Sequence, residues 1–199
     1  MALSSRFGGK LRHSGGQNLS KTRDETGSRQ RDGAVAGATY GVGVTLPDIA
    51  PLEFLVGTWR GRGRGDYPTI DGFDYVEEIS FSTMPKPFLA YQQRTKRADD
   101  GQPLHAETGY VRPVHDGPEL VICQPTGIVE AHRGRLEEQQ IIWDSHRVAM
   151  TPTAESHRVT KVRRELRVEG DELRYELHMG AVGQPLQLHL RATLHRAEA

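Results

Sequence analysis

The sequence of 199 residues contains a single cysteine, Cys123, and this scarcity excludes several kinds of protein. One thiol cannot form a disulfide within the chain, and it cannot supply a zinc site made of several cysteines. The N-terminal residues include basic side chains but no apolar stretch of the kind that a secretory signal requires. We therefore expect a cytoplasmic protein without disulfides.

Excess charge and long apolar runs are also lacking. Lys and Arg together number 26, as do Asp and Glu, so the formal net charge is zero. This balance gives no electrostatic reason to bind nucleic acid or an anionic membrane. No apolar run approaches the roughly 18 residues that a membrane-spanning helix needs. Since 36 % of the residues are hydrophobic, the chain can still bury a core, and we expect small molecules as its partners.

The composition changes near residue 45. Residues 1–45 are rich in Gly, Ser and Arg, are mildly basic, and show no hydrophobic period. We expect this segment to be a disordered tail, with a weak phosphate-binding or partner-recruiting arm as the alternative. Residues 46–199 are expected to form one domain.

From residue 46 onward, apolar residues recur at every second position, as in β-strands with one buried face. The clearest segment alternates Leu173, Tyr175 and Leu177 with charged residues, directly after the turn signal Glu169-Gly170-Asp171. Further strands are predicted over 88–97, 103–114, 119–124, 128–137, 139–149 and 158–168. Turn residues separate them, and no long amphipathic helix intervenes.

Eight to ten strands joined by short turns indicate an antiparallel meander. Closing such a sheet into a barrel removes its exposed edges, and a barrel of this size can hold one small ligand. A sandwich would need longer crossover connections. The sequence thus predicts an all-β fold, a single up-and-down antiparallel barrel of about ten strands, with a short helical turn over 47–56 that plugs the mouth.

Familiar catalytic patterns are missing from this barrel. The nine histidines lack the close spacing of a helical zinc site, and no serine lies in a Gly-x-Ser-x-Gly elbow. The glycines and arginines of 61–65 lack the Lys-Ser/Thr ending of a phosphate-binding loop. These patterns are therefore set aside.

His189 is harder to place. Its neighbours Leu188 and Leu190 belong to an apolar face that runs from Leu186 to Leu194, so strict alternation puts His189 on the solvent side. Gly183 and Pro185 interrupt this strand, however, and such interruptions can change which side faces inward. Both orientations remain open at this point.

A glycine-rich run near residue 57 places Gly57, Trp59, Gly61 and Gly63 on one side of a strand. Glycine within a strand marks a bend or a close approach of another group. By itself the run fits a barrel corner around a core tryptophan. Lipocalin-like and fatty-acid-binding barrels carry a similar Gly-x-Trp, so the run alone does not identify a ligand.

Further motifs follow in order along the chain: Tyr67-Pro68-Thr69-Ile70, Lys86-Pro87-Phe88-Leu89, Pro103-Leu104-His105-Ala106-Glu107-Thr108-Gly109-Tyr110, and Val182-Gly183-Gln184-Pro185-Leu186 with His189-Leu190. Together with the Gly-x-Trp-x-Gly-x-Gly run, they resemble the nitrobindins, a family of haem-binding β-barrels also described as peroxynitrite isomerases. The resemblance covers roughly residues 46 to 198.

The resemblance implies a ten-stranded barrel with haem b at one open end. His189 matches the proximal histidine that binds the iron, and Thr69 and His105 match residues near the haem. A lysine that the family has in a Pro-Thr-Ala-Lys run is replaced, with His157 as the nearest substitute. Trp59 and the motif glycines would shape the barrel near the haem rather than react.

The implied activity belongs to the iron, with no further catalytic residue. Ferric iron would isomerise peroxynitrite to nitrate, and ferrous iron would bind nitric oxide. The main alternative is a lipocalin-like carrier of a small apolar ligand without iron. A homodimer is compatible with either reading.

Overall fold

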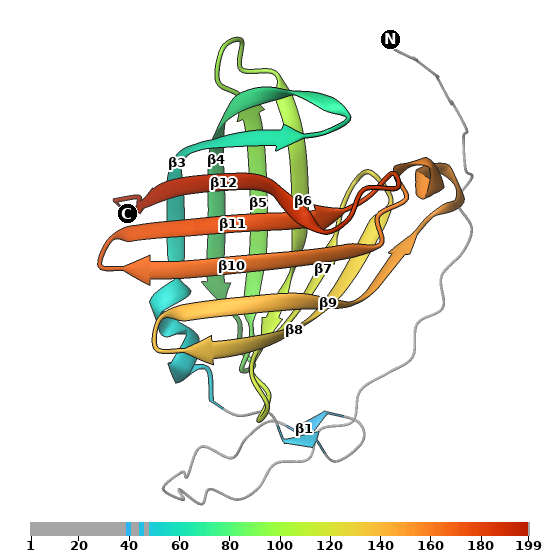
Figure 1. Ribbon diagram of the computed structural model, residues 1–199. Helices are drawn as coiled ribbons and strands as arrows, with labels where there is room; N and C mark the ends of the chain where they lie inside the picture. The colour runs from blue at the N-terminus through green and yellow to red at the C-terminus, as the bar shows by residue number, and fades with distance from the viewer. Residues whose placement is uncertain (1–38, 41–43, 46–47, 199) are drawn as a thin grey trace, which may run out of the picture. The chain divides into compact units, whose positions relative to one another are not determined.

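The computed structural model describes residues 39–40, 44–45 and 48–198 (Figure 1). Two short strands, β1 (Thr39–Tyr40) and β2 (Val44–Thr45), pair with each other in antiparallel fashion. The rest of the segment 1–45 lies outside the described residues, so its expected disorder stays a prediction. None of the helices in the described ranges is long and apolar enough to cross a membrane.

Ten antiparallel strands close into a barrel, in which each strand pairs with its neighbours along the chain and β12 pairs with β3. They are β3 (Gly57–Tyr67), β4 (Ile70–Thr83), β5 (Leu89–Arg97), β6 (Pro103–Arg112), β7 (Glu119–Cys123), β8 (Ile128–Glu137), β9 (Gln140–Met150), β10 (Lys161–Glu169), β11 (Glu172–Gly180) and β12 (Gln187–Arg196). The predicted up-and-down barrel is confirmed.

The strands form where the sequence alternates. In β11, Leu173, Tyr175 and Leu177 are buried, whereas the residues between Leu173 and Leu177 on the other face are charged and exposed. The hairpin between β10 and β11 turns at Gly170, which has a φ of 58°. Glycine adopts this left-handed conformation without a steric penalty, which explains the tight turn.

One end of the barrel is plugged by the 3-10 helix η1 (Ala50–Leu55). Leu52 and Leu55 are buried in the core, and the Trp59 indole Nε1 donates to the carbonyl oxygen of Leu55 at 2.9 Å. The Arg196 guanidinium lies 4.1 Å from the centre of the Trp59 ring. Trp59 is therefore a structural anchor that joins the helical turn to β3 and β12.

Trp59 lies near the start of β3, away from the cavity described below. It lies eight residues before Tyr67, where the strand reaches the open end, and a strand rises by about 3.3 Å per residue. The separation along the strand is thus about 26 Å. The helical turn plugs the end of the barrel opposite to the cavity described below.

The glycines of the same run are required by close approach. A Cβ atom at Gly61 would lie 2.1 Å from the carbonyl oxygen of Thr193, and one at Gly63 would lie 2.3 Å from the Tyr75 ring. Gly61 therefore lets β12 pack against β3. Gly63 leaves room inside the barrel for Tyr75, whose ring lines the cavity.

Candidate functional site

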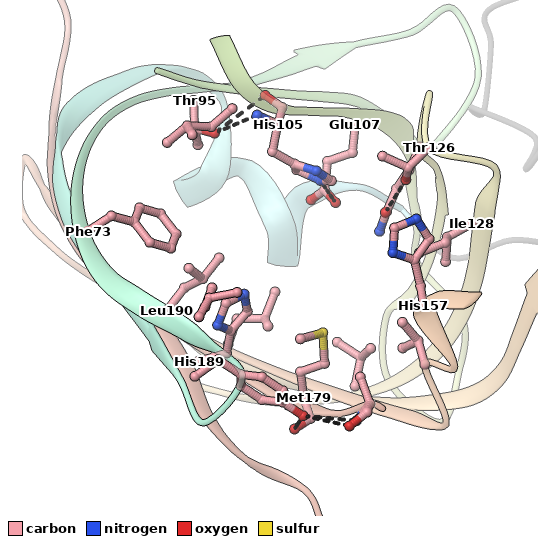
Figure 2. Close-up of a pocket in the computed structure, with 18 of the residues that line it drawn as sticks. Phe73, Thr95, His105, Glu107, Thr126, Ile128, His157, Met179, His189 and Leu190 are labelled. Atoms are coloured by element: carbon pink, nitrogen blue, oxygen red, sulfur yellow. Dashed lines mark hydrogen bonds and ion pairs between the residues drawn. The ribbon is translucent and has the colours of Figure 1, made fainter. Parts of the chain in front are cut away.

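The open end of the barrel contains a cavity of about 790 Å³ (Figure 2). This volume lies in the upper part of the range of about 300–1,000 Å³ that is typical of small-molecule and cofactor sites. Apolar side chains supply much of the wall: Phe73, Leu104, Ile128, Val159, Val162, Leu177, Met179, Val182 and Leu190. The walls therefore suit a largely apolar ligand.

The four residues that the sequence analysis selected all line this cavity. Thr69 lies in the turn between β3 and β4, and His105 lies on β6. His157 ends the 3-10 helix η2 (Pro152–His157), and His189 lies near the start of β12. Residues up to 120 positions apart are thus brought to one opening, as Figure 2 shows for the three histidines.

A β-bulge decides the orientation of His189. Leu177 of β11 pairs with Leu190, but the next residue, His178, pairs with Leu188, so His189 is an extra residue in β12. A bulge of this kind interrupts the alternation of side chains. Both His189 and Leu190 line the cavity as a result.

The bulge also separates two halves of an apolar face that looks continuous in the sequence. Beyond it, Ala192 and Leu194 point into the core and are 7 % and 0 % exposed, whereas Leu186 and Leu188 before it are both 39 % exposed. Strict alternation thus holds only after the bulge. The register shifts at His189 itself rather than at the interruptions near residue 184.

Two neighbours fix the His189 ring. Its Nδ1 lies 3.1 Å from the backbone carbonyl oxygen of Asp66, and the Tyr67 ring packs edge-on against it at 5.1 Å between centroids. Because a carbonyl oxygen only accepts hydrogen bonds, Nδ1 carries the proton and Nε2 keeps its lone pair. Burial lowers the pKa of His189, so the imidazole is neutral at pH 7. A neutral imidazole with a free Nε2 is a common metal ligand.

His105 is held by a carboxylate on its own strand. Its Nε2 lies 3.3 Å from an oxygen of Glu107, and its backbone N–H donates to the Thr95 hydroxyl at 3.1 Å. Burial by itself raises the pKa of Glu107, but the charge of Arg164 and the hydrogen bonds from His105 and Arg164 together outweigh burial and hold that pKa well below its usual range. Glu107 is therefore ionised and accepts from His105.

Beneath the cavity lies a buried ionic cluster. Arg164 contacts both Glu107 and Glu130, at 2.7 and 3.1 Å, and Glu130 also accepts from His132 at 2.8 Å. Burial lowers the pKa of His132, so this ring is neutral at pH 7. Gln124 adds a further hydrogen bond to Glu130 at 2.8 Å.

A second buried acid lies beside this cluster. Glu77 is 4 % exposed, and burial raises its pKa to about 8, so it is protonated at pH 7. The Gln93 amide donates to one carboxyl oxygen. The other oxygen has no hydrogen-bond partner among the described residues.

Sequence reasoning missed this polar layer, although a signal was present. Glu77 has the same parity as Phe73 and Ile79, and Arg164 has the same parity as Val162. A charged residue at an inward position of an alternating strand indicates a buried polar site. The cavity therefore has apolar walls and a charged floor.

These features define a class of protein. The fold is a β-barrel with one plugged end, and its open cavity offers the neutral imidazole of His189, apolar walls and a polar rim. Such a site suits a flat apolar cofactor that is bound through a metal.

Comparison with known proteins agrees with this class. A family model described as THAP4-like, heme-binding beta-barrel domain matches residues 48–196. Peroxynitrite isomerase 1 of Mycolicibacterium paratuberculosis is 53 % identical over 157 residues, which are 75 % of this chain and 95 % of that protein. Peroxynitrite isomerase of Nocardia farcinica is 51 % identical over 155 residues, which are 75 % of this chain and 91 % of that protein.

Among solved structures, Rv2717c from M. tuberculosis has a TM-score of 0.69 and 44 % sequence identity, and the match covers 76 % of this chain and 98 % of that one. The S-type phycobiliprotein lyase CPES from Guillardia theta shares the fold alone, with a TM-score of 0.54 at 8 % identity over 77 % of this chain and 94 % of that one. The chain belongs to the nitrobindin-type family of haem-binding β-barrels.

Proposed function

We propose that this protein binds haem b in the cavity through His189 and isomerises peroxynitrite to nitrate. The observation that carries the proposal is the neutral His189 ring. Its Nδ1–H donates a hydrogen bond to the Asp66 carbonyl oxygen, so Nε2 is available to a metal. The names of the curated relatives support the reaction. Nitric oxide is proposed as a second ligand, bound when the iron is ferrous.

The residues present fit a haem. Phe73, Ile128, Met179 and Leu190 offer apolar surface to a flat macrocycle and exclude water from it (Figure 2). Thr69 and His157 are exposed at the rim of the cavity, where they can donate hydrogen bonds to the carboxylates of the cofactor. His157 would thereby take the place of the lysine of the family.

When bound, the haem supplies a Lewis-acidic iron, and the protein supplies its surroundings. His189 would hold the metal, and its hydrogen bond to the Asp66 carbonyl fixes the ring and raises the basicity of Nε2. The walls limit the size of what can enter beside the metal. The cytoplasmic location and the homodimer stay predictions from the sequence.

The binding half of the proposal is tested with His189→Ala. We expect the Soret band of the haem-reconstituted protein to be lost, because the axial ligand is removed, while the far-ultraviolet circular dichroism is unchanged. His195→Ala is the matched control, since His195 lies on the same strand and is exposed to solvent. A variant at 189 that keeps stoichiometric haem with an unaltered spectrum contradicts the assignment.

The catalytic half is tested by stopped-flow decay of peroxynitrite with nitrate as the measured product. The ferric protein is expected to accelerate the decay beyond equimolar free haem. Equal rates would contradict the isomerase activity and indicate a protein that only binds haem or nitric oxide. A purified chain that takes up no haem would instead favour a carrier of another apolar ligand.

A further inference from the structure

Glu107 is the most heavily hydrogen-bonded acid of the cavity floor. Tyr91 donates to one carboxylate oxygen at 2.6 Å, and Arg164 donates to both oxygens at 2.7 and 3.0 Å. His105 makes the fourth contact, at 3.3 Å. The carboxylate is thus fixed from three strands, and its only contact to a half-exposed cavity residue is the one to His105.

Stability alone does not account for this arrangement. Removing charges from water costs several kcal/mol per ion, and a buried ion pair is often no more stable than apolar residues of similar volume. The cluster also carries a surplus charge, since Glu107 and Glu130 share one Arg164 while His132 is neutral. The net charge of these groups is therefore −1.

The contact with Glu107 determines the tautomer of His105. A carboxylate only accepts, so the ring donates through Nε2–H and the lone pair is on Nδ1. Nδ1 has no hydrogen bond to any described residue, and the ring projects into the cavity (Figure 2). Other ionisable groups that line the same cavity are Tyr67, Asp71, Tyr75, Arg97, Glu130, His157, Arg164 and His189.

We propose that Glu107, clamped by Arg164, is a positioning residue that fixes His105 as the Nε2–H tautomer, so that Nδ1 accepts a proton from a weakly acidic oxygen ligand in the cavity. The ligand class, a protonated oxyacid such as peroxynitrous acid, rests on the proposed function. The O–H bond of the ligand breaks, an N–H bond forms at Nδ1, and the oxyanion and an imidazolium remain. No oxidant or reductant is needed.

The tautomer is tested without haem and without activity. In long-range ¹H–¹⁵N spectra of the full-length chain at pH 8, His105 is expected to show a protonated Nε2 and an unprotonated Nδ1. Glu107→Gln should convert this signature to a mixture of tautomers. Glu130→Gln is the matched control, because it removes the other partner of Arg164 but no contact of His105, and the signature should persist.

A wild-type His105 with a protonated Nδ1, or an equal change in both variants, overturns the positioning role. The wild-type spectrum decides this even if a variant fails to fold.

The kinetics of peroxynitrite decay give a second test. His105→Gln and Glu107→Gln should each lower kcat/KM by roughly 10²-fold, the lower end of the range for a positioned general base, and the double variant should be no slower than either single variant. Additive losses contradict a joint action. If the wild type is inactive but His105 is the Nε2–H tautomer, the isomerase function is refuted and the positioning role of Glu107 is not.

Discussion

At the scale of single residues, the site depends on which nitrogen of each histidine carries a proton. In His189 the Nδ1–H donates a hydrogen bond to a backbone carbonyl, which leaves the lone pair of Nε2 for a metal. In His105 the Nε2–H donates to a carboxylate, which leaves the lone pair on Nδ1. The two rings line the same cavity with opposite tautomers. Their chemistry therefore follows from the neighbouring acceptor and not from the residue type.

Glu77 gives a prediction for the dependence of stability on pH. Its folded pKa of about 8 is raised by burial from 4.5, so between these values the folded state holds a proton that the unfolded state lacks. Stability should thus fall as pH rises through this window, by up to about 1.4 kcal/mol per pH unit. Glu77→Gln keeps the neutral shape and should lose this slope.

Urea unfolding of both proteins at pH 5 and pH 8 measures the effect. The variant is expected to gain stability over the wild type as pH rises, because other titrating groups contribute equally to both proteins. A difference between the two that does not change with pH would show that Glu77 is ionised in the fold.

At the scale of elements, irregularities of the strands build the cavity. Register shifts in the strand pairings occur between Gly65 and Tyr67, between Thr95 and Lys96, between Ala131 and His132, and between Leu177 and His178, where His189 is the extra residue. Each adjoins a residue that lines the cavity. Bulges are known to accumulate at barrel rims and active sites, where they redirect side chains.

Trp59, at the other end of β3, has a structural role, and Trp59→Phe tests this. The variant loses the hydrogen bond to the Leu55 carbonyl, which is buried at the plugged end. Leaving such an acceptor unpaired costs about 1–3 kcal/mol, so the midpoint of urea unfolding should fall. Haem affinity should not change, because Trp59 and the cavity lie at opposite ends of the strand. A selective loss of haem would place the motif in the site.

At the scale of the whole molecule, the barrel has two unlike ends and a polar layer between them. The plugged end is filled by apolar side chains around Trp59, Leu52 and Leu55. The charged layer around Arg164 follows, and the open cavity comes last. A closed sheet supplies the rigid frame that holds these layers in order.

Removal of residues 1–45 is the prediction at this scale. Among the described residues, the side chains that line the cavity all lie between Tyr67 and Leu190, and the family model begins at residue 48. The shortened chain should therefore keep the Soret band and peroxynitrite decay of the full-length protein within about twofold. This is measured by haem titration and stopped flow. Loss of haem binding in a folded truncation would assign the segment a part in the site.

The sequence by itself determined the strands, the barrel and the family. Alternation is a local property, readable from segments such as β11, and the motifs around Trp59 and His189 are contiguous. A periodic pattern describes one segment at a time, so it could not show that Thr69, His105, His157 and His189 meet at one cavity. Only the family resemblance singled out these four residues.

The tertiary structure alone decided which way His189 faces, which end is plugged, and what lies under the cavity. A single bulged residue reverses every side chain on one side of it, and its position depends on the pairing of β11 with β12. The buried carboxylates of Glu107 and Glu130 are compensated by Arg164, which reaches Glu107 from 57 residues away. Contacts between distant segments exist only after the sheet closes, so no local pattern contains them.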